Sequence, residues 1–301
     1  MFTRRATLLG AAALAACSHG DQGEREALAA ERIRAIEARV GGRIGVGALN
    51  TGTDAWIAHR QNERFAMAST FKWLLAAQML QMGDLSQRVL FNEGDLLDYA
   101  PATRARIRDT EIGRMGEMTV EELCEAIVVV SDNTAANLLL EGVFGPEGFT
   151  RSLRANGDGV TRLDRNEPML NENAPGDERD TTTPDAMART MRRFLLGHVE
   201  MGEPPLNPAA RERLIGWLIA CRTGLERLRA GFPADWIAGD KTGTGLRGAV
   251  NDVAIAWPPS VQGANRAPIL IACYMSGSEA PTRELSAAHA EIARVIVEAW
   301  S

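Results

Sequence analysis

Strand-like patterns of apolar residues occur near both ends of the 301-residue chain. Apolar residues alternate over 43–50, a turn-forming segment follows at 50–54, and a second short run covers 55–59. This order predicts a β-hairpin. Towards the other end, apolar and small residues alternate over 253–257. Residues 269–275 are continuously apolar, which is typical of a strand buried on both faces.

Helical spacing of apolar residues characterises most of the chain between and beside these strands. It is present over 24–40, through much of 68–220, and again over 286–300. Thr119 and Glu122 form a capping-box pattern in front of apolar positions spaced by three and four residues. We therefore expect helices in the middle of the chain and one near each end.

The order of these elements predicts the domain organisation. Residues 24–62 and 220–301 would form one α/β domain, and residues 63–219 an inserted all-α domain. One stretch, 164–184, has three prolines and no regular period. A segment this long without secondary structure in a compact protein is typically functional, so we interpret 163–181 as an Ω loop that lines a site.

Residues 1–20 have the composition of a secretory signal, in which Arg4 and Arg5 precede a short apolar run. The paired arginines favour a twin-arginine export route. The sequence LAAC, which ends at Cys17, resembles a bacterial lipoprotein box and would place a lipid on that cysteine; plain cleavage near Ala16 is the alternative. Both alternatives predict a periplasmic or otherwise extracytoplasmic protein, tethered to the membrane if Cys17 is lipidated. No later run is long and apolar enough to span a bilayer.

Composition excludes several classes of protein. A formal net charge of −6 argues against a dedicated nucleic-acid binder. The four histidines are scattered without ligand spacing, so we expect no transition-metal site. Four cysteines are too few for a disulfide scaffold. We expect Cys124, Cys221 and Cys273 to be small buried residues with free thiols, with a Cys221–Cys273 bridge as the alternative.

The segment Ser69-Thr-Phe-Lys72 begins an apolar helix and carries the first candidate chemistry. Residues three apart share one helix face, so the amine of Lys72 can take the proton of the Ser69 hydroxyl if burial lowers its pKa. The serine N–H at the helix start can also stabilise an oxyanion. On its own, this spacing equally fits a capping serine and a surface lysine.

Two further motifs make coincidence improbable. Ser131-Asp132-Asn133 follows an apolar helix, and Lys241-Thr242-Gly243-Thr244 precedes a strand. Ser131 can pass a proton to a leaving nitrogen, and a cation with neighbouring hydroxyls can hold a substrate carboxylate. Gly243 allows close approach to the strand backbone. The GxGxxG match that begins at Gly243 is discounted as a dinucleotide motif because a strand, not a helix, is predicted after it.

With these three motifs in this order, the chain resembles the class A serine β-lactamases, for which the motif set is known. The resemblance covers nearly the whole chain after residue 24. It implies an antiparallel sheet flanked by helices, built from both termini, with a helical domain inserted. It also implies an E-x-x-L-N signature at Glu167 to Asn171, a place for a cis bond before Pro168, and an Arg165–Asp180 ion pair.

The resemblance implies a covalent route that needs no metal or organic cofactor. Ser69 attacks the β-lactam carbonyl, and its proton passes to Lys72, or to Glu167 through a water. Ser131 protonates the ring nitrogen, and Glu167 then activates the deacylating water, which Asn171 helps to position. The residues implied for substrate binding are Asn133, Tyr99, Lys241, Thr242, Gly243, Thr244 and Arg227. We expect a monomer whose partners are small-molecule β-lactams.

Several positions depart from common family patterns. Val250 stands where many members carry a carboxylate-supporting arginine, and Arg227 is the candidate replacement; a surface helix arginine is the alternative. Ala68 with Gly245, and Ala76 opposite Cys124, leave two disulfides of other members without their cysteines. These departures bear on the substrate spectrum and leave the core mechanism unchanged.

Three other functions fit part of this pattern. A penicillin-binding D,D-peptidase shares the serine, lysine and KTG chemistry but lacks a deacylating carboxylate, which Glu167 with Asn171 would supply. A β-lactam sensor would be acylated once and is usually fused to a membrane segment. A Ser–Lys amidase of another fold leaves the second and third motifs unexplained.

Overall fold

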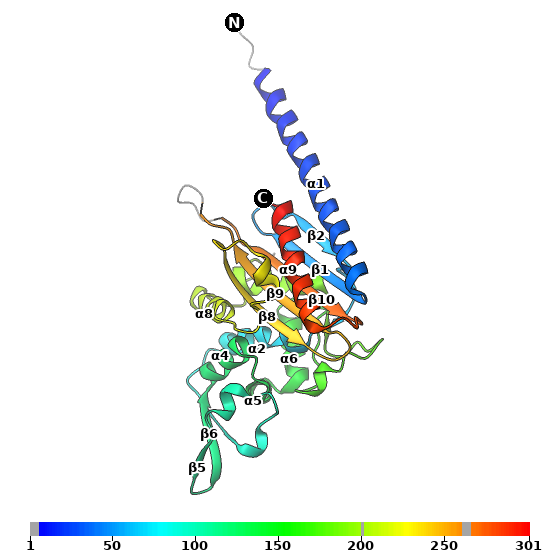
Figure 1. Ribbon diagram of the computed structural model, residues 1–301. Helices are drawn as coiled ribbons and strands as arrows, with labels where there is room; N and C mark the ends of the chain where they lie inside the picture. Colours follow the sequence, from blue (N-terminus) through cyan, green and yellow to red (C-terminus); the bar gives the residue numbers. More distant parts are fainter. Residues whose placement is uncertain (1–5, 200–201, 261–265) are drawn as a thin grey trace.

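The computed structural model describes residues 6–199, 202–260 and 266–301, with side chains from residue 22 onward. Its main sheet is antiparallel, with strand order β2-β1-β10-β9-β8. Strands from the two ends of the sequence lie side by side in it (Figure 1). The five strands are β1 (Arg43–Asn50), β2 (Trp56–His59), β8 (Ile237–Thr244), β9 (Val250–Trp257) and β10 (Ile269–Ser276). The predicted hairpin and both later strands are thereby confirmed.

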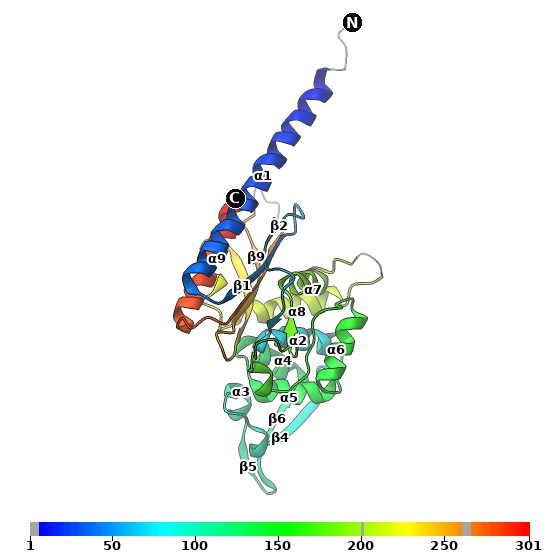
Figure 2. The same cartoon turned by 90° about the vertical axis from the view of Figure 1, so that its right-hand side faces the viewer.

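Helices cover both faces of this sheet, which explains why its strands are buried nearly throughout. On one face, alternate residues of β10 such as Ile271 and Cys273 belong to a core shared with α1 (Ala6–Val40) and α9 (Thr282–Ala299). On the other face, Leu270 and Ala272 belong to the core shared with α7 (Pro184–Leu196) and α8 (Pro208–Ile219). Figure 2 shows the sheet between these two helical layers.

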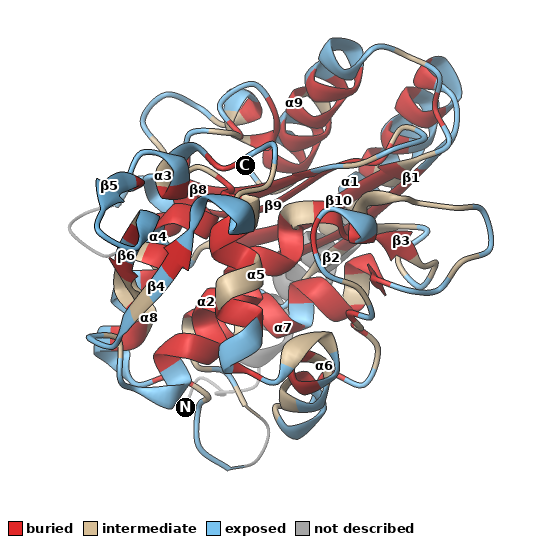
Figure 3. Ribbon diagram, turned by 90° about the horizontal axis from the view of Figure 1, so that it is seen from below, coloured by how far each residue is buried: buried red, intermediate tan, exposed pale blue. Residues whose placement is uncertain are grey.

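The middle of the chain is mainly helical, as expected. At its centre α2 (Phe71–Met82) is apolar on nearly all sides and buried from Phe71 to Leu80, which is the pattern of a core helix. Figure 3 shows this burial in red. Around it lie α3 (Pro101–Arg104), α4 (Val120–Val129), α5 (Asn133–Gly142) and α6 (Gly145–Ala155). The capping box of Thr119 and Glu122 is formed at the start of α4.

The middle region also contains two small sheets, so it is not all-α as the sequence predicted. One has the order β4-β6-β5, and the other pairs β3, just before η1, with β7 at the end of the loop segment. The strands of the first sheet are largely polar or exposed, and β3 and β7 have only two residues each, so neither sheet leaves an alternating apolar signal. They are β3 (Phe65–Ala66), β4 (Arg88–Asn92), β5 (Arg108–Thr110), β6 (Gly113–Thr119) and β7 (Thr181–Thr182). The short 3₁₀ turns are η1 (Ala68–Thr70), η2 (Glu93–Asp95), η3 (Met169–Asn171) and η4 (Leu228–Gly231).

The N-terminal helix is longer than expected, because α1 begins at Ala6 and runs through the predicted signal segment without a break. Residues 1–5, with Arg4 and Arg5, lie outside the described residues, as does the side chain of Cys17. Among the described helices, none combines the length and the hydropathy needed to cross a bilayer.

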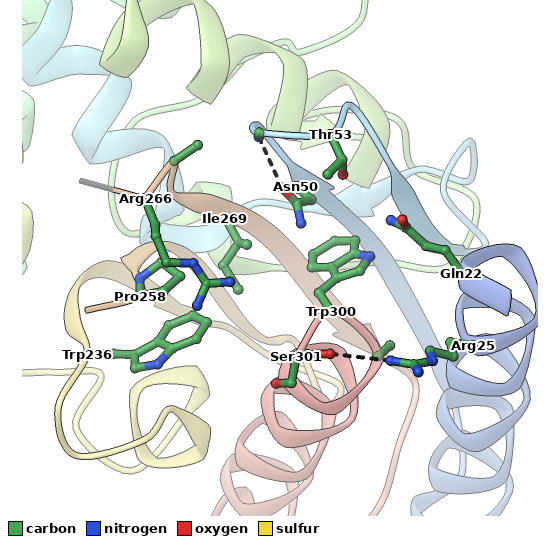
Figure 4. Close-up of a pocket in the computed structure, with 13 residues that line it drawn as sticks. Gln22, Arg25, Asn50, Thr53, Trp236, Pro258, Arg266, Ile269, Trp300 and Ser301 are labelled. Carbon is green, nitrogen blue, oxygen red and sulfur yellow. Dashed lines mark hydrogen bonds between the residues drawn. The ribbon is translucent and has the colours of Figure 1, made fainter. Parts of the chain in front are cut away.

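Cys124, Cys221 and Cys273 are free and buried, as predicted, and no Cys221–Cys273 bridge forms. A cavity of about 430 Å³ lies where Arg25 of α1, the β1–β2 turn and the end of α9 meet (Figure 4). Trp236, Trp300 and Ser301 line it. None of the residues predicted for the site belongs to this cavity.

Candidate active site

The turn η1 and helix α2 bring Ser69 and Lys72 together at the junction between the main sheet and the helices. Lys72 is completely buried, whereas Ser69 is partly accessible. The Lys72 amine lies 2.9 Å from Glu167 Oε1 and donates to the Ser131 carbonyl at 2.8 Å and to Asn133 Oδ1 at 2.5 Å. The lysine is therefore the centre of a hydrogen-bonded group drawn from three separate segments.

Burial decides the acid–base character of Lys72. Removal from water lowers the pKa of its amine, and the Glu167 carboxylate opposes this shift because it stabilises the charged form. A buried lysine with a lowered pKa can accept a proton near neutral pH, which a solvated lysine does poorly. The Lys72–Glu167 pair can therefore gain or lose a proton next to the Ser69 hydroxyl.

Ser131 lies between two lysines. Its hydroxyl is 3.4 Å from Lys72 Nζ and accepts a hydrogen bond from Lys241 Nζ at 3.1 Å. The residue has a φ of 60°, in the left-handed region. This strained backbone joins α4 to α5 and turns the hydroxyl towards the cleft. A hydroxyl held by two amines is well placed to relay a proton.

The Asp132 carboxylate holds this strained junction in place. It is fully buried and caps α5 by accepting from the Ala135 N–H at 2.9 Å. It also accepts from the N–H groups of Ala102 and Thr103, both at 2.9 Å, at the start of α3. The central residue of this motif is therefore structural, while Ser131 and Asn133 on either side line the cleft.

Strand β8 forms the opposite wall of the site and packs directly on η1. A Cβ atom at Gly243 would lie 2.5 Å from the Met67 carbonyl oxygen, so this position requires glycine for the contact. The close approach brings Thr244 beside the segment that carries Ser69. Lys241 is completely buried, and removal from water, together with repulsion by Lys72, lowers its pKa to about 8.

Arg227 lies beneath the end of β8 instead of on a helix surface. Its guanidinium donates to the carbonyls of Gly243 at 3.0 Å and Asn251 at 2.6 Å, and to Thr244 Oγ1 at 2.7 Å. Burial lowers the pKa of this arginine. Val250 is buried in the apolar core, so it offers no polar group to the cleft.

The loop at 163–181 brings Glu167 to the site. Its Oε1 atom lies 3.3 Å from Ser69 Oγ, and its Oε2 accepts from the Asn171 amide at 2.5 Å. The Glu167–Pro168 bond is cis, and Arg165 pairs with Asp180 at 2.6 Å across the neck of the loop, as the resemblance implied.

Most of the predicted residues meet in one cleft of about 390 Å³. Its wall includes Tyr99, whose ring is about half exposed at 51%. The lining residues are Ser69, Tyr99, Ser131, Asn133, Asn171, Thr223, Arg227, Thr242 and Thr244. Lys72, Glu167, Lys241 and Gly243 lie behind this lining and contact it.

Sequence reasoning missed two residues of this site. Asn137 exchanges two 3.0 Å hydrogen bonds with the backbone of Glu167. Its spacing of four from Asn133 would have placed it on the same helix face. Thr223 Oγ1 lies 2.6 Å from Thr242 Oγ1 and enters the cleft from a turn, where the sequence carries no comparable signal.

Comparison with known proteins adds a second line of observation. A family model described as "Beta-lactamase enzyme family" matches residues 28–300. The chain is 45% identical to β-lactamase AST-1 of Nocardia asteroides, over 98% of this chain and 94% of the relative. It is 44% identical to β-lactamase FAR-1 of Nocardia farcinica, over 90% and 82%.

Solved structures of β-lactamases are also similar to this chain. The structure of an ancestral class A β-lactamase superposes with a TM-score of 0.82 at 50% identity, covering 90% of this chain and 99% of that one. A β-lactamase from Xanthomonas campestris superposes with a TM-score of 0.83 at 41% identity, covering 92% and 99%.

Proposed function

The chain belongs to the class A β-lactamases, and we propose that it hydrolyses penicillin- and cephalosporin-type antibiotics through an acyl-enzyme on Ser69. One observation carries the proposal: the Glu167 carboxylate lies 3.3 Å from Ser69 Oγ and 2.9 Å from Lys72 Nζ. A β-lactam-acylated serine enzyme becomes a hydrolase only if a base can activate water beside the ester. This loop carboxylate is such a base.

Acylation uses the groups on both walls of the cleft. Ser69 Oγ attacks the ring carbonyl as its proton passes into the Lys72–Glu167 pair. The oxyanion that forms is held by the backbone N–H groups of Ser69 and Thr244, each worth about 3 kcal/mol of barrier. Ser131 protonates the ring nitrogen as the C–N bond breaks, and Lys72, which contacts its hydroxyl, passes on the proton taken from Ser69 to replace it. Lys241 stays charged and holds the Ser131 hydroxyl by a hydrogen bond.

Deacylation uses the loop. Glu167 takes a proton from a water molecule as that water attacks the ester carbonyl, and Asn171, hydrogen-bonded to Glu167 Oε2, orients the water. Ser69 then recovers its proton from the Lys72–Glu167 pair. No step requires a metal ion or an organic cofactor.

Substrate binding relies on charge and hydroxyl groups at the end of β8. Lys241, Thr242 and Thr244 would hold the substrate carboxylate, with Arg227 supporting Thr244 through a 2.7 Å hydrogen bond. On the other wall Lys72 holds Asn133 Oδ1, which leaves the amide nitrogen of that residue to bind a substrate side-chain carbonyl.

Outside the site, we propose that a signal within residues 1–20, cleaved directly before Cys17, exports the protein, that a lipid on Cys17 tethers it to the membrane, and that it acts as a monomer. Lipid labelling of the wild-type protein but not of Cys17→Ser would support the anchor. Size-exclusion chromatography of the chain without its signal tests the monomer.

The deciding experiment mixes purified protein with excess chromogenic cephalosporin. We expect steady turnover by the wild type and none by Ser69→Ala. Glu167→Ala should acylate, lose about 10²–10⁴-fold in deacylation rate, and retain an adduct visible by intact mass. Glu178→Gln on the same loop, whose side chain is 66% exposed, is the control and should match the wild type. A single stoichiometric burst by the wild type would instead indicate a D,D-peptidase or a sensor.

A further inference from the structure

The loop that carries Glu167 is attached to the turn after β8 by three consecutive residues. The Asn171 carbonyl accepts from the Leu246 N–H at 2.8 Å, and the Glu172 carbonyl accepts from Arg247 at 2.6 Å. The Asn173 amide donates to the carbonyls of both Leu246 and Arg247, each at 3.1 Å. Of these three residues, only Asn173 makes the attachment with its side chain.

Asn173 also joins the turn to the end of β10. Its amide nitrogen lies 3.1 Å from Ser276 Oγ, and its Oδ1 accepts from the same hydroxyl at 3.2 Å. The residue has a φ of 49°, a left-handed conformation that asparagine adopts more readily than most residues do. One side chain therefore binds the loop both to the turn after β8 and to the end of β10.

The attachment matters for the position of the loop because the chain is not closely packed behind it. A cavity of about 650 Å³ lies there, lined in part by Asn173, Asp177, Arg247 and Ser276. Polar contacts therefore help to hold this part of the loop. Arg165 holds the loop as well, through Asp180 at its neck and through Glu172 at 2.5 Å, and Asn137 binds the Glu167 backbone.

The attachment connects the proposed oxyanion site to the loop that carries the residues proposed for deacylation. The turn at 245–249 continues directly from Thr244, whose N–H is the proposed oxyanion donor. The loop carries Glu167 and Asn171, which would position the deacylating water. The separation between ester carbonyl and water therefore depends on how firmly the loop is held to the turn.

We propose that Asn173 is a positioning residue for deacylation: through Leu246, Arg247 and Ser276 it sets the distance between the water-activating loop and the oxyanion site. This inference rests on the proposed function. A displacement of about 1 Å at a reacting centre can cost up to about 100-fold in rate. Loss of the attachment should therefore slow deacylation by about 10- to 100-fold and leave acylation within about threefold.

The test compares Asn173→Gly with Asn173→Ala. Glycine removes the side chain and keeps the left-handed backbone without strain, whereas alanine adds strain to the same loss. On a substrate whose burst shows that deacylation limits turnover, slower deacylation lowers kcat and KM together and leaves kcat/KM unchanged. We expect this signature in Asn173→Gly, with accumulated acyl-enzyme visible by stopped-flow and intact mass.

Ser276→Ala should show the same signature more weakly, and its effect should not add to that of Asn173→Gly because the two side chains share one contact. Glu178→Gln is the control and should behave as wild type. A kcat of Asn173→Gly within twofold of wild type overturns the inference. An equal loss of kcat and kcat/KM with unchanged KM also overturns the inference, because it would mean that a smaller fraction of the enzyme is folded. Absence of turnover in the wild type would instead overturn the proposed function.

Discussion

Raising the pH should remove the cation that we propose binds the substrate carboxylate. Lys241 is completely buried, and its amine donates to Ser131 Oγ and the Thr242 carbonyl. Removal from water is the main cause that lowers its pKa to about 8, and the positive charge of Lys72 adds to it. In water a lysine side chain stays charged to about pH 10. The cation at this site should therefore be lost in an accessible pH range.

The size of the effect follows from that pKa. The protonated fraction of Lys241 falls from about 90% at pH 7 to about 10% at pH 9. For a carboxylate-bearing β-lactam, kcat/KM should fall about tenfold per pH unit above 8, because this ratio reports the free enzyme. Bound carboxylate stabilises the ammonium form, so the corresponding decline in kcat should lie at higher pH.

The titration of Lys241 does not itself destabilise the fold. Between about pH 8 and 10 the unfolded state keeps its Lys241 proton while the folded state has lost it. The unfolded state then binds more protons, so this group makes the free energy of unfolding rise with pH. The Lys241 contribution to stability should therefore rise over the pH range in which activity falls. The buried thiols act in the opposite sense, because burial raises the pKa of Cys124, Cys221 and Cys273.

The assay measures kcat/KM from pH 6 to 10 for a penicillin and for its methyl ester, which has no carboxylate. The free acid should lose activity above pH 8, and the ester should not. A flat profile for the acid up to pH 10 would refute the assignment. An equal decline for acid and ester would place the titrating group elsewhere, for example at Lys72 or Ser69.

Two further changes test the architecture of the site. Asp132→Ala removes the α5 cap and the charge-assisted contacts to α3. The free energy of unfolding, measured in urea, should therefore fall by about 3–5 kcal/mol. A loss below about 1 kcal/mol would contradict this. Gly243→Ala places a Cβ 2.5 Å from the Met67 carbonyl oxygen, so β8 must move away from η1. We expect kcat/KM to fall by at least about 100-fold. Activity close to wild type would contradict this, because it would show that the strand can shift freely.

Local periodicity explains which parts of the fold were predictable. The strands β1, β9 and β10 are recognisable because the helices on both faces of the sheet require apolar residues along them. The sheet of β4, β5 and β6 was missed because its strands are short and mostly exposed, with no apolar pattern to mark them. The unbroken extent of α1 was likewise missed, because its first part had been assigned to a signal.

Some residues of the candidate site were likewise predictable from local sequence, and others were not. The relation of Ser69 to Lys72 follows from helix geometry, and motif order was enough to identify the serine, the second hydroxyl and the binding strand. By itself, Arg227 fitted a surface helix as well as the cleft, and Glu167 fitted a solvated loop carboxylate better than a catalytic residue. Only the resemblance to a family gave them a role before the structure placed them.

The sequence by itself determined the candidate nucleophile, the spacing to its lysine and the elements that carry both, because these depend on residues within a few positions of one another. The tertiary structure decided what those groups can do. It brought Glu167, 98 residues away along the chain, to Ser69. It also buried Lys72 and Lys241 deeply enough to lower their pKa values. Burial and the electrostatic field at a side chain come from segments far apart in sequence, and these meet only when the chain folds.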